Sequence, residues 1–247
     1  MTQRQIEFSS GGCLLRGIYH EVTAGPAILC LHGLTLSHDM FADLGLMAER
    51  AGISLLRFHM RGHHDSGGEL KTQGFLDEVA DALAGMEFLK QQSGIDSDRL
   101  GLLGFSLGGA VAAVATKKVS LKALATWGSL FDTQRWKDAR FEQYRTPQAG
   151  PVKIWDDIEV SSRLFSEAIA CNPYQDALDF AGPMFLAHGG RDRNHPQNKS
   201  IELVADRKAL GKIAEGFFPE RSGHKFQVPE DWKLLNEKTF DFFKANL

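Results

Sequence analysis

The chain has 247 residues, of which 43% are hydrophobic and 24% are charged, and its formal net charge is −3. These proportions fit one large globular domain as well as two small ones, and they are typical of a soluble protein. Because Lys and Arg are scattered rather than grouped, the sequence indicates neither a nucleic-acid footprint nor a basic membrane-binding face. We therefore expect a small-molecule partner and no nucleic acid.

Cysteine usage and apolar runs bear on the cellular compartment. The three cysteines are widely spaced and form no C-x-x-C pattern, which argues against a disulfide framework or a zinc site. The first ten residues lack the apolar core of a signal peptide. The longest uncharged run, Leu100 to Thr116, contains four glycines and is shorter than the roughly 20 apolar residues of a membrane-spanning helix. These features predict a cytoplasmic protein without membrane insertion.

Short apolar runs alternate with longer amphipathic segments along most of the chain, after two apolar segments near Ile6 and at Leu14 to Tyr19. The runs predict strands at Ala27 to Leu31, Ser54 to Met60, Arg99 to Phe105, Leu121 to Trp127, Pro183 to His188 and Lys212 to Phe218. The amphipathic segments predict helices at Met40 to Ala51, Phe75 to Gln92, Leu107 to Lys118, Gln197 to Leu210 and Pro229 to Asn246. Because the strand runs are continuously hydrophobic, both faces of the sheet should be covered. The alternation predicts an α/β fold with a mostly parallel sheet and helices on both faces.

Residues 131–180 interrupt the alternation. They form a connection of about fifty residues, whereas most connections run about 2 to 6. No sheet strand is obvious in them, although Val160 to Ala170 could be helical. Seven aromatic residues argue against disorder: Phe131, Trp136, Phe141, Tyr144, Trp155, Phe165 and Tyr174. We therefore expect a core of residues 1–130 and 181–247 and an ordered insertion of residues 131–180.

A serine lies where a predicted strand becomes a predicted helix, in the stretch Gly104-Phe105-Ser106-Leu107-Gly108-Gly109. A serine on a sharp strand-to-helix turn projects its hydroxyl above the sheet, and glycines two residues before and after it relieve the crowding of that turn. Gly104 and Gly108 occupy those positions. The pattern predicts that Ser106 is a nucleophile, and a glycine-rich turn with an incidental serine is the alternative.

A serine hydroxyl becomes a good nucleophile when a base accepts its proton and a carboxylate orients that base. Among the nine histidines, His224 follows the last predicted strand near the end of the chain and is the candidate base. Asp192 follows the predicted strand that ends at His188 and is the candidate acid, and Asp132, which also follows a strand, is a rival. The sequence therefore predicts a catalytic set of Ser106, Asp192 and His224.

A second loop can stabilise the negative charge that develops during acyl transfer. His32-Gly33-Leu34-Thr35 directly follows the predicted strand Ala27 to Leu31. In this position the backbone N–H of Leu34 can point at the same spot as the N–H of Leu107, which begins the helix after the serine. Leu34 and Leu107 are therefore the candidate oxyanion-hole residues.

Together these residues resemble the α/β-hydrolase superfamily, and the resemblance covers nearly the whole chain. The run Leu56 to Gly68 contains Arg-Gly-His-His-Asp-Ser, which resembles the R-G-H-G-x-S segment of the esterase branch. The stretches around Gly33 and Ser106 are similar to those of bacterial carboxylesterases, cinnamoyl or feruloyl esterases and monoacylglycerol lipases.

The resemblance implies an α/β-hydrolase fold with eight strands, a small cap formed by residues 131–180, and no cofactor. It implies a catalytic triad and an oxyanion hole at the residues already identified: Ser106, Asp192, His224, Leu34 and Leu107. Two departures from the family pattern are expected to change the shape of the entrance to the substrate pocket. His64 stands where glycine is usual, and Arg191 to Pro196 lacks the usual apolar residue before its proline.

A histidine cluster in the sequence raises the question of a metal site. His59, His63, His64 and Asp65 are close together, but their spacing matches no common zinc pattern. Loop histidines of this kind are usually polar surface. We expect no metal.

The sequence supports the hypothesis of a serine hydrolase that acts on small-molecule carboxylic esters through an acyl-enzyme intermediate. The aromatic residues of the insertion predict an apolar roof over Ser106, which would favour short to medium acyl or aryl esters, including hydroxycinnamoyl esters. A thioesterase or an amide-cleaving hydrolase is the alternative, because a triad does not choose the leaving group. A non-catalytic ligand-binding module on the same fold is a third hypothesis, of a different class.

Overall fold

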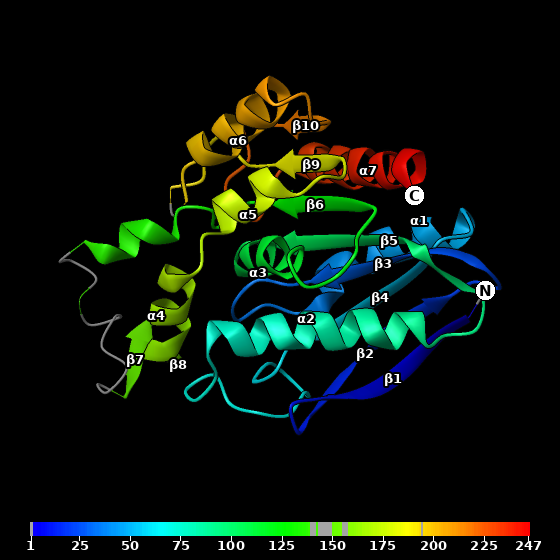
Figure 1. Cartoon of the computed structure of the whole chain (residues 1–247), viewed down its shortest axis with the longest axis horizontal. Coiled ribbons are helices and arrows are strands. Elements are labelled where there is room, and N and C mark those ends of the chain that lie inside the picture. Colours follow the sequence, from blue (N-terminus) through cyan, green and yellow to red (C-terminus); the bar gives the residue numbers. More distant parts are fainter. Residues whose placement is uncertain (1, 139–141, 143–149, 155–157, 194) are drawn as a thin grey trace.

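The computed structural model describes residues 2–138, 142, 150–154, 158–193 and 195–247 (Figure 1). Its main sheet contains β1 (Thr2–Ser10), β2 (Cys13–Glu21), β3 (Gly25–Leu31), β4 (Ser54–His59), β5 (Ile95–Phe105), β6 (Ala123–Trp127), β9 (Met184–Ala187) and β10 (Ala214–Phe217). The spatial order is β1-β2-β4-β3-β5-β6-β9-β10. β2 is antiparallel to both of its neighbours, and every other neighbouring pair in the sheet is parallel. The predicted eight-stranded, mostly parallel sheet is confirmed.

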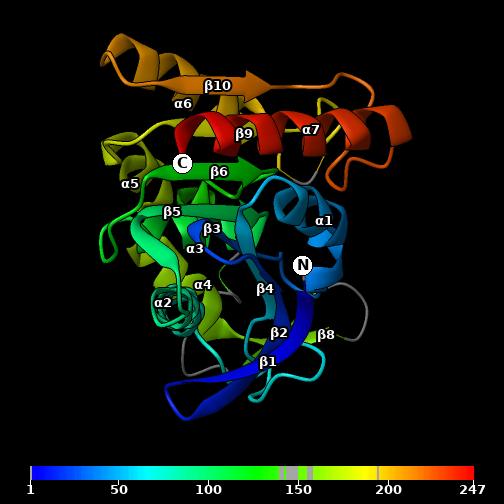
Figure 2. The same ribbon diagram turned by 90° about the vertical axis from the view of Figure 1, so that its right-hand side faces the viewer.

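Helices cover both faces of this sheet (Figure 2). One face carries α1 (Ala42–Arg50), which the short 3-10 helix η1 (His38–Phe41) precedes, and α7 (Pro229–Asn246). The other face carries α2 (Phe75–Lys90), α3 (Leu107–Ala115) and α6 (Asn198–Ala209). Within the described residues, no helix has the length and apolar character needed to cross a membrane.

The central strands are hydrophobic throughout because their side chains serve two separate cores. In β3, Ile28 and Cys30 pack in the core beneath α1 and α7, whereas Ala27 and Leu29 pack in the core beneath α2 and α3. All four side chains are fully buried. Successive strand residues point to opposite faces, so a strand covered on both sides shows no alternation between apolar and polar residues.

The helices and strands that the sequence predicts overlap the observed elements, with differences at their ends. The largest concerns β5, which begins at Ile95 rather than at the expected Arg99. Its first five residues are exposed or half-buried, so they carry no hydrophobic signal. Backbone pairing of Ile95 with Gly25 defines the strand there.

The insertion between β6 and β9 contains more structure than its sequence indicates. A 3-10 helix η2 (Thr133–Lys137), a hairpin of β7 (Pro151–Ile154) and β8 (Ile158–Ser161), α4 (Ser162–Ala170) and α5 (Pro173–Asp179) follow one another. The hairpin forms a sheet of its own, which the sequence analysis missed because β7 is half exposed and its four residues are too few for a pattern. The expected helix at Val160 to Ala170 is α4, but its first two residues belong to β8.

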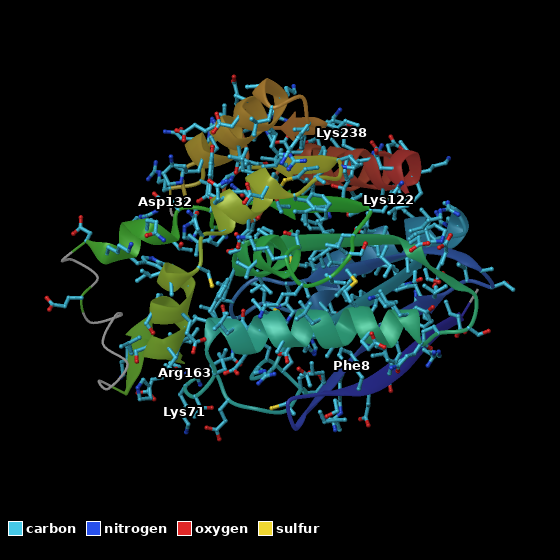
Figure 3. The ribbon with its side chains drawn as sticks, in the orientation of Figure 1. Phe8, Lys71, Lys122, Asp132, Arg163 and Lys238 are labelled. Carbon is cyan, nitrogen blue, oxygen red and sulfur yellow. The ribbon has the colours of Figure 1, made fainter. Side chains whose placement is uncertain are left out.

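Parts of the insertion pack onto the main body. The rings of Trp136 and Phe165 meet edge to face at 4.9 Å, and both side chains belong to the core beneath α2 and α3. Figure 3 shows Arg163 of α4 near Lys71 of the loop before α2, and Arg163 Nη1 donates a hydrogen bond to the Thr72 carbonyl oxygen at 3.3 Å. Three aromatic residues of the expected roof lie outside the described residues: Phe141, Tyr144 and Trp155.

A carboxyl group is fully buried near the start of α2. Gln73 Nε2 donates to Glu78 Oε1 at 2.9 Å, whereas Glu78 Oε2 and Gln73 Oε1 have no hydrogen-bond partner within the described chain. Burial, reinforced by the Asp81 carboxylate, raises the pKa of Glu78 to about 8. Protonation removes the charge that burial disfavours, so the folded protein holds this group as a neutral acid at neutral pH.

Glu78→Gln should therefore remove a pH-dependent loss of stability. Glu78 ionises in the unfolded chain near its ordinary pKa of 4.5 but in the folded chain near 8, so unfolding releases a proton between these values and the parent loses stability as the pH rises. We expect the variant to match the parent near pH 4.5 and to gain on the order of a few kcal/mol by pH 8.

Denaturant unfolding at several pH values from 4.5 to 8.5 measures this difference. The exposed carboxyl of Glu220 provides the control, because Glu220→Gln should keep the pH dependence of the parent. A difference between parent and Glu78→Gln that stays constant over this range would contradict a buried neutral acid.

Candidate active site

Ser106 lies on a tight turn between β5 and α3. Its backbone is in the left-handed region, with φ 55° and ψ −117°, which is a strained conformation for a residue other than glycine. A Cβ atom on Gly104 would collide with the Gly108 carbonyl group, and one on Gly108 would collide with the carbonyl oxygens of Leu31 and His32. The two glycines therefore let α3 start directly against β5 and β3 and hold the serine at the edge of the sheet.

The structure brings the three predicted catalytic residues together. His224 Nε2 lies 2.9 Å from Ser106 Oγ, and His224 Nδ1 lies 2.5 Å from Asp192 Oδ2. The three side chains come from the loops after β5, β9 and β10, whose carboxyl ends lie at the same edge of the sheet. They form a continuous hydrogen-bonded chain from a buried carboxylate to a half-buried hydroxyl.

The Asp192 carboxylate is surrounded by donors. Its side chain is 0% exposed, and Oδ1 accepts a hydrogen bond from the His195 N–H at 2.9 Å. Oδ2 accepts from His224 and, at 3.1 Å, from His188 Nε2. Burial opposes ionisation, but the hydrogen bonds from His188 and His224 outweigh it and hold the pKa of Asp192 below its usual range. Asp192 is therefore a fixed negative charge next to His224.

The rival acid lies elsewhere. Asp132 precedes η2, beyond the end of β6 (Figure 3), and is half-buried. Over the described ranges, no hydrogen bond or ion pair joins Asp132 to His224, whereas Asp192 makes both. The geometry favours Asp192 as the orienting acid.

The loop after β3 lies against the nucleophile. A Cβ atom on Gly33 would sit 3.0 Å from Ser106 Cβ, so the backbone of this loop touches the serine turn. In the part of the chain that the structure describes, the N–H groups of Leu34 and Leu107 donate to no protein acceptor. They are available to a substrate oxygen, as an oxyanion hole requires.

Two buried histidines fix the shape of this loop. His32 Nδ1 donates to the Gly33 carbonyl at 2.8 Å, and its Nε2 accepts from the Met60 N–H at 3.1 Å. His63 Nε2 accepts from the Thr35 N–H at 3.0 Å. Burial lowers the pKa of His32 well below the usual range and that of His63 to about 4, so both rings stay neutral and keep an acceptor nitrogen.

The other members of the sequence cluster have protein partners. His59 Nδ1 lies 2.6 Å from Asp65 Oδ1, and His59 Nε2 lies 3.0 Å from Ser37 Oγ. The His59 and His64 rings stack at 4.4 Å. His64 has a φ of 48°, which explains why glycine is usual at this position.

A cavity of about 400 Å³ adjoins the catalytic residues. Leu130, which lines it, donates its N–H to the Ser106 carbonyl oxygen at 3.3 Å. His195, also in the wall, packs its ring 5.2 Å from the His224 ring. Phe131 and Pro196 also line the cavity, and the other lining side chains are polar or charged: Ser129, Asp132, Arg135, Asn198, Lys199 and Glu202.

His195 takes the place of the apolar residue that is usual before this proline. Burial, together with the nearby His224 ring, lowers the pKa of His195 to about 4. A neutral imidazole therefore stands beside the candidate base. Sequence reasoning missed the contacts of His32, His63 and His188, although each of these histidines lies at or just after a strand that leads into the site.

The profile of the prolyl oligopeptidase family matches residues 40–247. The chain belongs to this family. An uncharacterized protein of Mycobacterium tuberculosis is 38% identical over 104 residues, which are 41% of this chain and 36% of that protein. The thiohydrolase aneE of Aspergillus aculeatus is 32% identical over 118 residues, which are 45% of this chain and 36% of that enzyme. The chain thus matches about a third of the length of these relatives.

Solved structures support the fold. Est1E from Butyrivibrio proteoclasticus, solved with ferulic acid bound, superposes with a TM-score of 0.84 over 98% of both chains at 16% sequence identity. The likeness to this esterase shows that the chain has the α/β-hydrolase fold. Family membership and the hydrogen-bonded serine, histidine and aspartate together support a hydrolase.

Asp192→Asn should lower kcat by about 10⁴ while the protein stays folded, because an amide cannot hold the His224 imidazole in the orientation and tautomer that the serine needs. Asp132→Asn should change kcat far less. Steady-state kinetics on a chromogenic ester, with circular dichroism as the control for folding, measures both variants. The reverse order of effects would assign the acid to Asp132.

Proposed function

We propose that this protein is a serine hydrolase that cleaves carboxylic esters through an acyl-enzyme intermediate on Ser106. The observation that carries the proposal is the unbroken hydrogen-bonded chain from Asp192 Oδ2 through His224 to Ser106 Oγ. A hydroxyl at the end of such a chain has its base already in reach, and the base has its orienting carboxylate.

In the acylation step, Ser106 Oγ attacks the ester carbonyl carbon and its proton moves to His224 Nε2. The carbonyl oxygen gains the negative charge and accepts hydrogen bonds from the N–H groups of Leu34 and Leu107. The carbon–oxygen bond to the alcohol then breaks, and His224 Nε2 gives its proton to the leaving alkoxide. Asp192 remains a carboxylate throughout.

In the deacylation step, water takes the place of the alcohol. His224 Nε2 accepts a proton from the water, whose oxygen attacks the acyl carbon on Ser106. Collapse of the second tetrahedral intermediate returns the proton to Ser106 Oγ and releases the carboxylic acid. The same base therefore serves both steps, and the proposal needs no metal or cofactor.

We further propose that the preferred substrates carry short to medium acyl or aryl groups. The adjoining cavity of about 400 Å³ is near the lower end of the roughly 300–1,000 Å³ typical of small-molecule sites. Leu130 and Phe131 give it an apolar wall beside the serine turn, and residues 131–180 would act as a small cap over it. The ferulic acid bound to Est1E is an aryl acid of this size class.

Cleavage of another acyl bond is the second candidate. The names of the prolyl oligopeptidase family and of the thiohydrolase aneE point to peptides and thioesters. The triad itself accommodates all three leaving groups, because His224 can protonate an alcohol, a thiol or an amine. The leaving group is therefore a question for kinetics.

A panel of chromogenic esters, thioesters and anilides tests the proposal. We expect the highest kcat/KM for butyrate to octanoate or hydroxycinnamate esters, lower values for acetate and palmitate esters, and little cleavage of anilides. A fluorophosphonate probe should label the parent at Ser106, and Ser106→Ala should lose both the label and the hydrolysis. EDTA should leave the rates unchanged.

The outcomes separate the candidates. Faster thioester or anilide cleavage would replace the ester assignment while leaving the mechanism in place. Equal rates for all chain lengths would contradict the role of the cavity. A parent that binds the probe nowhere and hydrolyses no member of the panel would leave the non-catalytic ligand-binding module as the better description.

A further inference from the structure

A second histidine contacts the candidate acid at the same carboxylate oxygen as the candidate base. His188, which directly follows β9, is 1% exposed. Its Nε2 lies 3.1 Å from Asp192 Oδ2, the same oxygen that His224 Nδ1 approaches, and 2.6 Å from the His195 carbonyl oxygen. Its Nδ1 lies 2.8 Å from Ser200 Oγ, which belongs to α6.

The partners of His188 determine where its proton sits. A carbonyl oxygen is only an acceptor, so Nε2 must carry a hydrogen, and that hydrogen faces both the His195 carbonyl and the Asp192 carboxylate. The Ser200 hydroxyl completes the hydrogen bonding of the ring at Nδ1. Ser200 is itself 2% exposed, so this arrangement is shielded from water.

His188 also takes part in the hydrogen bonds that fix the loop that carries Asp192. The His195 N–H donates to Asp192 Oδ1, the His195 carbonyl accepts from His188, and the Asp192 N–H donates to the Gly189 carbonyl at 3.1 Å. Both carboxylate oxygens are thus held from within the same loop. His224, whose loop follows a different strand, also approaches Oδ2.

We propose that His188 is a positioning residue of the hydrolytic reaction, which orients the Asp192 carboxylate toward His224 through a shared hydrogen bond on Oδ2. His188 is not among the residues that line the adjoining cavity, and it contacts the wall through a hydrogen bond to the His195 carbonyl oxygen. It therefore acts through Asp192 and the loop of Asp192, and not on the substrate. Loss of this donor weakens the hold on Oδ2, which lets the carboxylate turn from the direction that His224 needs, although Oδ1 still accepts from the His195 N–H. The inference rests on the proposed function, because it assumes that Asp192 orients the base.

The test compares variants of this histidine with matched controls. His188→Leu removes the donor and keeps much of the volume, whereas His188→Gln keeps an N–H near the position of Nε2. Ser200→Ala removes only the partner of Nδ1. His20→Leu is the control for loss of a buried histidine, because His20 is fully buried and bonds to Glu49 and Arg57, away from the triad.

All rates are expressed per active site, titrated with the fluorophosphonate probe, so that a misfolded fraction does not count. We expect His188→Leu to lower kcat on the order of 10- to 100-fold, in the range typical of residues that orient a reacting group, with KM changed less than about threefold. His188→Gln should recover most of the loss, Ser200→Ala should cost less than His188→Leu, and His20→Leu should keep the parental kcat.

The decisive comparison repeats His188→Leu in the Asp192→Ala background. If His188 acts through the carboxylate, the second substitution should change kcat by less than about twofold there. The same 10- to 100-fold loss in both backgrounds, or an unchanged kcat for His188→Leu in the parent, would overturn the proposal. Failure of the probe to label the parent would instead overturn the proposed function, which keeps the two failures distinguishable.

Discussion

The hydrogen bond between His224 Nδ1 and Asp192 Oδ2 is the interaction on which the site depends. It joins the loop after β9 to the loop after β10 and aims His224 Nε2 at Ser106 Oγ. The parallel sheet makes this contact possible, because β5, β9 and β10 all end at one edge. A buried carboxylate in that position remains charged because neighbouring N–H groups replace the water that it has lost. The strength of the contact therefore comes from the surrounding loop as much as from its two members.

Backbone packing fixes the position of Ser106, which is the other end of the hydrogen-bonded chain. The positive φ of Ser106 is held by its N–H bond to the Trp127 carbonyl at 2.8 Å and by the close contacts of Gly104 and Gly108. Contacts with β6 and β3 on either side thus maintain the strained backbone conformation of this turn. The loop after β3, which carries the candidate oxyanion-hole residue Leu34, is fixed independently by His63, so the candidate nucleophile and the candidate oxyanion hole are arranged before any substrate arrives.

The sequence predicted the fold best where the hydrophobic pattern follows directly from the geometry of the sheet. Continuous apolar runs identified the strands because both sheet faces are covered, and the ends of those strands located Ser106, Asp192 and His224. The hairpin of β7 and β8 left no comparable signal, because it is short and outside the main core. The pairing of His188 with Asp192 depends on how one loop folds back on itself, which no periodicity records. Likewise, the sequence shows Glu78 only as a polar helix residue, although its carboxyl group is buried.

Proton NMR of ¹⁵N-histidine-labelled enzyme tests the central contact most directly. A proton in a short hydrogen bond to a carboxylate resonates far downfield of the amide region, so the account predicts such a signal from His224 Nδ1–H in the resting enzyme. Its loss in His224→Gln assigns it. It should disappear in Asp192→Ala and persist in Asp132→Asn. Absence of this signal from the parent, or its survival in Asp192→Ala, would contradict the claim that Asp192 orients the base.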